Sequence, residues 1–445
     1  MLLSWSSSSS SRQRAEAASL IEDSLSSERL DVTNATRNAE QAQASLAVTI
    51  KVIHAVAVFR RLLRNRQERL GLPSTPPSPP LTAIDNAGQP TCPTVEWDEL
   101  KIGQLLGQGA FCSAYAVNLS KQRQHEVFEA YAVGQDPPFQ TCYKLLLPEH
   151  KHCKLATADL KREAVLLSHL RHEHVMGALC HGVTPQGDTF VVMPLLGSTL
   201  SAALPRPVDE VSLLKHRAQV KAWPLVRAVR LAVQLGRALR YCHREAFPGC
   251  AVLHRDLKPD NVGLTPRGGD VMLFDFGLAK ITSPCAAGEP ATQGGPKLTG
   301  QTGSLRYMAP EVALCEPYDE RADVYSFAII LWQMAARAVP FAGVAAVGGI
   351  EGFIERVARQ GLRPPLPPKW PAALRQTLAT CWEAEVPRRA TICAALPALE
   401  SLLVELELGA TRPKSAGAGG WPPCSAAAPP SRSHRPSIAR EHFAT

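Results

Sequence analysis

The chain lacks any pair of cysteines at CxxC spacing, although it contains 12 cysteines in 445 residues. Zinc sites and the disulfide frameworks of small secreted domains usually show closely paired cysteines. Scattered cysteines without such pairs are typical of reduced thiols in a cytosolic-type compartment. The cysteine pattern therefore argues against a secreted disulfide scaffold and predicts a cytoplasmic protein, with organelle targeting or a membrane surface as open alternatives.

A hydrophobic run long enough to cross a membrane is also missing. The most apolar segment, Leu46–Phe59, has only 14 residues and contains Lys51 and His54, whereas a spanning helix needs about 20 apolar residues. The first ten residues have no charged region followed by an apolar stretch, which a secretory signal peptide would show. We therefore expect neither a transmembrane span nor a signal peptide.

The chain has no strong excess of charge of either sign. Its formal net charge is +8 and its pI is about 8.9. Proteins that bind nucleic acids usually concentrate much more positive charge on one face. This mild basic balance predicts no nucleic-acid partner and is compatible with acidic or phosphorylated ones.

Composition changes along the chain and divides it into five segments. The stretch "GLPSTPPSPP" cannot continue a helix and favours an extended linker. The ends of the chain are rich in Ser, Pro, Gly and Ala, which is typical of disorder. We predict a disordered Ser-rich tail over 1–27, a helix with an arginine cluster over 28–70, a Pro-rich linker over 71–96, a folded domain over 97–408 and a disordered basic tail over 409–445.

The predicted helix over 28–70 ends in the basic stretch "RRLLRNRQER", which spans Arg60 to Arg69. A helix that is apolar on several sides and cationic at its end can lie on an anionic membrane surface or pair with another helix. Docking onto its own folded domain fits the same pattern. Peripheral membrane contact through Arg60–Arg69 is thus one of three open alternatives.

The folded segment divides into two halves of different type. Short apolar runs come first, in "LKIGQLLG", "CSAYAV", "TCYKLLL" and "TFVVMPLL", with one helical pattern at Leu160–Leu170. From Leu225 onward helical patterns dominate. This order predicts an α+β fold with a small β-rich lobe, a large helical lobe and a cleft between them. The helical patterns of the second half are Val226–Tyr241, Asp323–Ala335, Ile350–Gln360, Leu374–Trp382 and Thr391–Leu406.

Two features of the β-rich half could handle phosphate. In "LLGQGAFCSAYAV", Gly107 and Gly109 stand between strand-like runs, where glycine lets backbone N–H groups approach anionic oxygens. A GxG between strands is a weak signal by itself, because most are ordinary turns. Lys144 lies in an otherwise apolar strand and needs an anion or a route to solvent. Glu163, on the core-facing side of its helix, can be that anion.

Two further stretches carry catalytic side chains. The sequence "HRDLKPDN" offers Asp256, which can accept a proton from a hydroxyl, and Lys258, which can neutralise a transferred anionic group. Asp275 ends an apolar strand in "VMLFDFGLAK". Asn261 and Asp275 supply hard oxygen ligands of the kind that Mg²⁺ prefers.

Together these motifs resemble those of eukaryotic-type protein kinases. "HRDLKPDN", "DFG" at Asp275–Gly277 and "MAPE" at Met308–Glu311 occur in family order, and the resemblance runs from about Trp97 to Leu408, which makes 97–408 a protein kinase domain. "TGSLRYMAPEV" and "CWEAEVPRRAT" look most like the tyrosine-kinase-like group in its plant and algal style. The resemblance implies the two-lobed protein-kinase fold.

The resemblance also implies roles for individual residues. Asp256 would be the catalytic base, and Lys258 would stabilise the γ-phosphate. Lys144, steered by Glu163, would hold the α- and β-phosphates of ATP. Other implied positions are the Mg²⁺ ligands Asn261 and Asp275, the nucleotide-binding residues Leu106, Gly107, Gly109, Ala114 and Leu196, the gatekeeper Met193, the structural pair Glu311 and Arg389, and Asp323 as the anchor of the catalytic-loop backbone.

The chain departs from the family pattern in its glycine loop and in the strand that follows. Cys112 stands where the third glycine is usual, and Ala114 replaces the usual valine over the adenine. A rival register also exists, because "YAVG" places Gly134 where the lysine belongs. The Lys144 register is preferred because it leads into the Glu163 helix, and it implies an insertion over residues 119–140.

The resemblance implies a Mg²⁺- and ATP-dependent kinase that phosphorylates serine and threonine in protein substrates. Lys258, two places after the base, is typical of Ser/Thr kinases, and Ser304 falls where the family places a hydroxyl beside that base. The alternative is a pseudokinase scaffold that binds partners through residues 28–69. Phosphorylation of Thr299 or Thr302 is expected to order the segment between Gly277 and Ala309.

Overall fold

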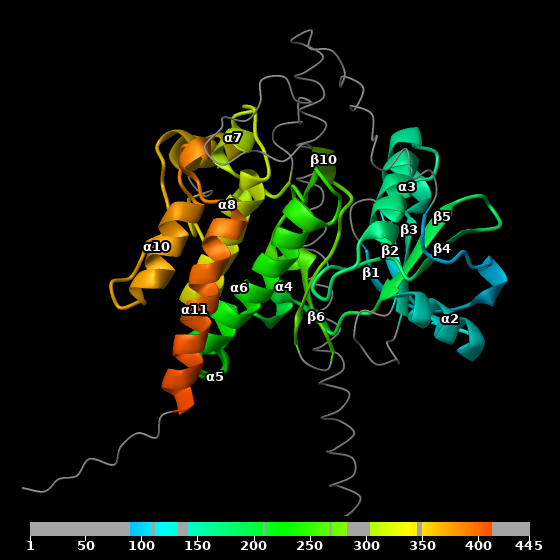
Figure 1. Ribbon diagram of the computed structural model, residues 1–445, viewed down its shortest axis with the longest axis horizontal. Coiled ribbons are helices and arrows are strands. Elements are labelled where there is room, and N and C mark those ends of the chain that lie inside the picture. Colours follow the sequence, from blue (N-terminus) through cyan, green and yellow to red (C-terminus); the bar gives the residue numbers. More distant parts are fainter. Residues whose placement is uncertain are drawn as a thin grey trace, which may run out of the picture.

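The computed structural model describes residues 90–108, 112–131, 141–207, 210–266, 269–282, 303–344 and 349–411. These residues form a β-rich small lobe and a helical large lobe, as the sequence predicts. In Figure 1 the sheet and α3 lie on the right and the long helices of the large lobe lie on the left. The predicted tail over 1–27 and helix over 28–70, including Arg60–Arg69, lie outside the described residues.

The small lobe is built on an antiparallel sheet, and its described strands follow the order β1-β2-β3-β5-β4. The sheet register places Lys144 opposite both Ala114 and Val191, in the middle of the sheet. The long helix α3 lies beside this sheet (Figure 1). The strands are β1 (Leu100–Gln108), β2 (Cys112–Leu119), β3 (Thr141–Leu146), β4 (Cys180–Val183) and β5 (Thr189–Pro194), and the helices are α2 (Lys121–Tyr131) and α3 (Lys154–His169).

Apolar side chains of alternate strand positions fill a separate small core behind the sheet. Tyr143 of β3 stacks on Tyr115 of β2 with ring centroids 5.3 Å apart. Trp97 meets both Tyr143 and Phe190 edge to face. Such aromatic pairs stabilise the fold beyond the contribution of the surface area that they bury. They therefore stabilise the sheet against which α3 packs.

The large lobe packs its long helices against one another. Helices α6, α8 and α11 run side by side at the centre of this lobe (Figure 1). Gly236 permits the close approach of α6 and α11, because a Cβ at that position would lie 2.9 Å from Leu396 Cδ1. The helices are α4 (Leu200–Ala203), α5 (Leu213–Lys221), α6 (Leu225–Arg240), α7 (Pro310–Ala313), α8 (Arg321–Ala336), α9 (Gly349–Ile354), α10 (Ala372–Cys381) and α11 (Ile392–Thr411).

Short strands of the large lobe carry the loops that face the small lobe. Strand β8 pairs with β6 and β9, and β7 pairs with β10. The catalytic-loop sequence lies between β7 and β8, and the DFG sequence follows β9. These strands are β6 (Ser198–Thr199), β7 (Ala251–Leu253), β8 (Val262–Leu264), β9 (Val271–Leu273) and β10 (Lys280–Thr282).

The structure modifies several predicted boundaries. The segment predicted as one helix at Ile350–Gln360 is α9 followed by a π-helical turn over Glu355–Arg359. Helix α11 continues to Thr411, three residues into the predicted tail. The insertion between β2 and β3 contains helix α2, whose Val127 is fully buried. The buried Val127 side chain anchors this insertion to the small lobe, although the local sequence does not predict an ordered segment there.

The end of the predicted linker packs against the small lobe. Cys92 and Val95 are buried, and the Val95 N–H donates to the His181 carbonyl of β4 at 2.9 Å. The His181 N–H donates in turn to the Pro93 carbonyl at 3.1 Å. Buried Cys92 and Val95 and these two hydrogen bonds thus hold the last residues of the predicted linker against the small lobe.

No helix among the residues that the structure describes combines the length and hydropathy needed to cross a membrane.

Candidate active site

Three charged groups from three different elements meet between the lobes. Lys144 Nζ of β3 lies 2.8 and 2.9 Å from the two carboxylate oxygens of Glu163 on α3. The same nitrogen lies 2.9 Å from Oδ1 of Asp275, which follows β9. This is the Lys144–Glu163 contact that the preferred register predicts; Gly134 of the rival register lies outside the described residues.

The three groups set one another's ionisation. Burial alone lowers the pKa of Lys144, but the nearby Asp275 and Glu163 carboxylates raise it by more. The pKa of the ammonium is therefore raised overall, and Lys144 is protonated at neutral pH. The Lys144 ammonium lowers the pKa of Asp275 to about 2. The Asp275 side chain is 41% exposed, against 4% for Glu163. Asp275 therefore presents a charged oxygen to the space between the lobes, while Glu163 is enclosed.

Three further polar side chains contact Asp256, two from the catalytic-loop sequence and one from Ser304. Lys258 Nζ lies 2.8 Å from Asp256 Oδ2, and Asn261 Nδ2 donates to the Asp256 carbonyl at 2.8 Å. The Ser304 hydroxyl donates to Asp256 Oδ1 at 3.0 Å. A hydroxyl on one carboxylate oxygen and a cation on the other is the arrangement that base-assisted transfer to an alcohol needs.

Buried groups behind the loop fix its backbone. The Asp323 carboxylate of α8 accepts from the backbone N–H groups of His254 and Arg255 at 2.8 and 2.9 Å, and it contacts His243 Nε2 at 3.1 Å. Although burial alone raises the pKa of Asp323, the hydrogen bond and charge of His243 lower it overall. An ionised carboxylate that accepts several N–H bonds holds a loop rigidly.

Two site residues adopt left-handed backbone conformations, which are uncommon outside glycine. Arg255 has φ 71° and Asp275 has φ 67°. Conformations of this kind concentrate at active sites because the surrounding structure must enforce them. Next to Asp275, Phe276 is buried and meets the His254 ring at 4.9 Å, which fixes the DFG turn against the catalytic loop.

The close approach of the segment near Ser304 to Asp256 depends on a glycine. Gly303 has φ +98°, and a Cβ there would lie 2.5 Å from the Arg255 carbonyl oxygen and 3.2 Å from Asp256 Oδ1. A side chain would clash with the backbone of the catalytic loop and be strained as well. Gly303 thus permits the hydrogen bond between Ser304 and Asp256.

The residues predicted to hold the nucleotide are spread over the sheet and the connection to the large lobe. Leu106 and Gly107 lie on β1, and Gly107 pairs with Ala114 of β2. Leu196 packs on Gly263 of β8, since a Cβ at Gly263 would meet Leu196 Cδ1 at 2.4 Å. Gly109 lies outside the described residues, as do Thr299 and Thr302.

Cys112, which replaces a glycine, lies beside the charged groups at the end of β2. Burial raises the pKa of its thiol to about 11, although the Lys144 ammonium acts in the opposite direction. The thiol is therefore neutral near pH 7. The substitution adds bulk but no charge to this part of the site.

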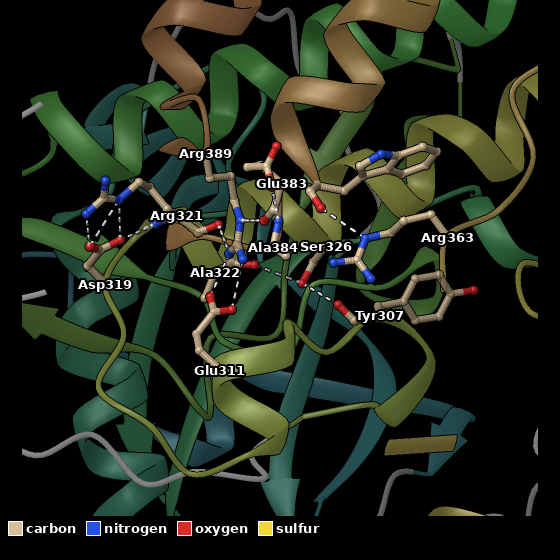
Figure 2. Close-up of polar contacts among 11 residues, drawn as sticks. Tyr307, Glu311, Asp319, Arg321, Ala322, Ser326, Arg363, Glu383, Ala384 and Arg389 are labelled. Atoms are coloured by element: carbon tan, nitrogen blue, oxygen red, sulfur yellow. Dashed lines mark hydrogen bonds and ion pairs between the residues drawn. The ribbon is translucent and has the colours of Figure 1, made fainter. Parts of the chain in front are cut away.

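The large lobe contains a second buried ionic group, drawn in Figure 2. Arg389 donates to both oxygens of Glu311, at 2.6 and 2.8 Å, to the Arg321 carbonyl at 3.1 Å and to the Glu383 carbonyl at 2.9 Å. Beside it, Arg321 pairs with Asp319 (Figure 2). The resemblance predicts the Glu311–Arg389 pair, whereas no motif in the sequence indicates the buried Asp319–Arg321 pair. Through Arg389, the segment that precedes α11 is joined to α7 and to the start of α8, whereas the Asp319–Arg321 pair is local to the start of α8.

The comparisons with known proteins agree with this geometry. The protein kinase domain matches residues 100–398, so the chain belongs to the protein kinase family, and it resembles the tyrosine-kinase-like group as the sequence predicts. It is 30% identical over 292 residues to serine/threonine-protein kinase VIK of Arabidopsis thaliana, covering 64% of this chain and 59% of that protein.

Two other similar proteins also match this chain over only part of their own length. Serine/threonine-protein kinase STY17 of Arabidopsis thaliana is 26% identical, over 71% of this chain and 48% of its own length. Mitogen-activated protein kinase kinase kinase 11 of Rattus norvegicus is 28% identical, over 71% of this chain and 32% of its own length. The match therefore spans a third to three fifths of these proteins.

Proposed function

We propose that the chain is a Mg²⁺- and ATP-dependent protein serine/threonine kinase, which transfers the γ-phosphate of ATP to hydroxyl groups of protein substrates and acts in signalling. The observation that carries this proposal is that two clusters are fully formed: Lys144 contacts Glu163 and Asp275, and Asp256 contacts Lys258 and Asn261. The Ser304 hydroxyl on Asp256 supports serine and threonine as the acceptors.

The nucleotide side of the reaction is assigned to the small lobe. Lys144 binds the α- and β-phosphates, and Glu163 holds the ammonium in place through its two short contacts. Leu106, Ala114 and Leu196 are assigned to the adenine, and Gly107 and Gly109 are assigned to the phosphates. The neutral thiol of Cys112 leaves the positive charge of Lys144 available to the phosphates.

The Mg²⁺ ligands are assigned to Asn261 and Asp275, whose chemistry fits this ion. The amide nitrogen of Asn261 donates to Asp256, so its oxygen is the end available for a cation. Asp275 is ionised well below neutral pH and is 41% exposed. Mg²⁺ held by these two residues would supply positive charge that offsets the negative charge of the phosphates.

Asp256 and Lys258 act on the acceptor side. Asp256 orients the substrate hydroxyl and accepts its proton while the hydroxyl oxygen forms a bond to the γ-phosphorus and the bond to ADP breaks. Lys258 stabilises the negative charge on the phosphoryl group during transfer. The Ser304 hydroxyl donates to Asp256 Oδ1, the oxygen that the substrate hydroxyl would reach.

The alternative of a pseudokinase scaffold rests on the altered glycine loop. Pseudokinases that act by binding need none of these charged groups, whereas here all of them are present and paired. The enzymatic reading is therefore favoured. A cytoplasmic location and membrane contact through Arg60–Arg69 stay predictions.

We expect the products to be phosphoserine and phosphothreonine. Purified chain incubated with γ-labelled ATP, Mg²⁺ and a mixed protein substrate should label both residues, because Lys258 and Ser304 form the Ser/Thr-type acceptor site. Acid hydrolysis and separation of the phosphoamino acids gives the answer directly. A label found mainly on phosphotyrosine would contradict the acceptor assignment, and no label with any substrate would support the scaffold.

A further inference from the structure

The stretch Thr91–Val95 reaches α3 as well as the sheet. Its Thr91 hydroxyl donates to the Ser168 carbonyl at 2.6 Å, and the Thr91 N–H donates to the Ser168 hydroxyl at 3.0 Å. Ser168 is fully buried in the last turn of α3. One residue of this stretch thus makes two hydrogen bonds to one residue of the helix.

The second contact point of the stretch is β4. Thr94 forms a parallel bridge to His181, and Cys92 Sγ lies 3.5 Å from His181 Nδ1. Buried Cys92 and Val95 hold the stretch against the lobe from within. These contacts fix the backbone next to Thr91, so the position of Thr91 relative to α3 is fixed as well.

The bond to the Ser168 carbonyl satisfies a group that the helix itself cannot satisfy. The last four carbonyls of an α-helix have no partner within it, and α3 ends at His169. The Leu167 carbonyl accepts from the Ala178 N–H at 2.9 Å, and the Ser168 carbonyl accepts from Thr91. Since Ser168 is shielded from water, removal of the Thr91 hydroxyl leaves a buried acceptor without its bond.

Helix α3 is also the element that positions Glu163. Glu163 lies five residues before Ser168, which is about 7.5 Å along the helix axis at 1.5 Å per residue. Its carboxylate must stay within hydrogen-bond distance of Lys144. A shift of the last turn of α3 is therefore transmitted over little more than one helical turn to the Lys144–Glu163 pair.

We propose that Thr91 is a positioning residue, which caps the C-terminus of α3 from outside the helix and so keeps Glu163 engaged with Lys144. The proposal rests on the proposed role of that pair in phosphoryl transfer. It extends the functional unit N-terminally beyond the region that matches the protein kinase domain, which begins at residue 100.

The test compares three variants of the full chain. Thr91→Val removes the hydroxyl at nearly constant shape, and Thr91→Ser retains it. Thr94→Val makes the same change at the residue of the same stretch that bridges to His181 of β4. We expect Thr91→Val to lower kcat/KM for ATP about three- to ten-fold, the change in an equilibrium that one net hydrogen bond produces. Thr91→Ser and Thr94→Val should each keep a kcat/KM for ATP close to that of the unaltered chain.

Hydrogen–deuterium exchange supplies a readout that does not depend on activity. Amides in the last turns of α3 should exchange about three- to ten-fold faster in Thr91→Val, for the same energetic reason. Ser168→Ala, which removes the hydroxyl that accepts from the Thr91 N–H, should change exchange in the same direction. Thermal unfolding of each variant, measured in parallel, allows activity to be expressed per folded molecule.

Unchanged α3 exchange in Thr91→Val would overturn the proposal whatever Ser168→Ala shows, because the Ser168 hydroxyl also donates to the Val165 carbonyl within α3 at 2.7 Å. So would wild-type kcat/KM per folded molecule in Thr91→Val, since a purely structural role predicts that result. If the unaltered chain transfers no phosphate, the proposed function fails, and the exchange measurement still decides whether Thr91 caps α3.

Discussion

Lys144→Met should abolish phosphoryl transfer while leaving the fold intact. Methionine fills a similar volume but removes the charge that contacts Glu163 and Asp275, so the phosphates of ATP lose their positioning cation. We expect kcat to fall by at least about a hundred-fold, because misplacing the reacting groups by about 1 Å has an effect of this size. The measurement is transfer of γ-labelled phosphate to a generic protein substrate.

A neighbouring lysine supplies the control for this variant. Lys161 lies on α3 and is exposed, so Lys161→Met makes the same chemical change without touching the site. It should retain full activity and the same thermal midpoint. If Lys144→Met turns over at the wild-type rate, another lysine carries the phosphate contact and the register of β3 in the family comparison must be changed.

Among these single substitutions, Arg389→Met should cause the largest loss in the free energy of unfolding. Arg389 and Glu311 are 2% and 4% exposed, and the variant leaves the Glu311 carboxylate buried without its cation. Removing one partner of a buried ion pair costs about 3–5 kcal/mol. For a domain of this size that loss should lower the thermal midpoint by roughly 5–10 °C. Differential scanning calorimetry measures the midpoint directly.

The adjacent arginine is the matched control. Arg388 is 72% exposed in its side chain and pairs with Glu385 at the surface, so Arg388→Met should change the midpoint very little. Adding Glu311→Leu to Arg389→Met should recover part of the lost stability, since the uncompensated charge is then removed. A midpoint for Arg389→Met equal to that of Arg388→Met would mean that the buried pair does not stabilise the large lobe.

The sequence predicted the lobes and most of the site because short motifs carry these features. Lys144 and Asp275 lie in or directly after apolar strands, and Asp256 lies in a polar loop, so each charged side chain must reach solvent or a partner. The spacing of these residues also matches that of the protein-kinase motifs. The contacts of Glu163 with Lys144 and of Asp323 with the loop backbone are present as the resemblance implies. These predictions depend on residue type and order, which the sequence contains.

Features that depend on contacts between distant segments could not be predicted in this way. The hydrogen bonds between Thr91 and Ser168 join residues 77 positions apart, and neither residue belongs to a motif. Helix α2 lies within an insertion, and its buried Val127 is supported by the sheet and not by local propensity. Long-range burial of this kind has no periodic signature in one sequence.

The most direct test of the proposed chemistry is phosphate transfer by the Asp256→Asn variant. The amide keeps the size of the side chain and can still contact Lys258, but it cannot accept the proton of a substrate hydroxyl. Incorporation of label from γ-labelled ATP is measured for the unaltered chain and the variant at matched folded concentrations. The proposal predicts steady labelling of serine and threonine by the unaltered chain and a loss of about a hundred-fold or more in the variant. Equal labelling by the two proteins would contradict the assignment of Asp256 as the catalytic base.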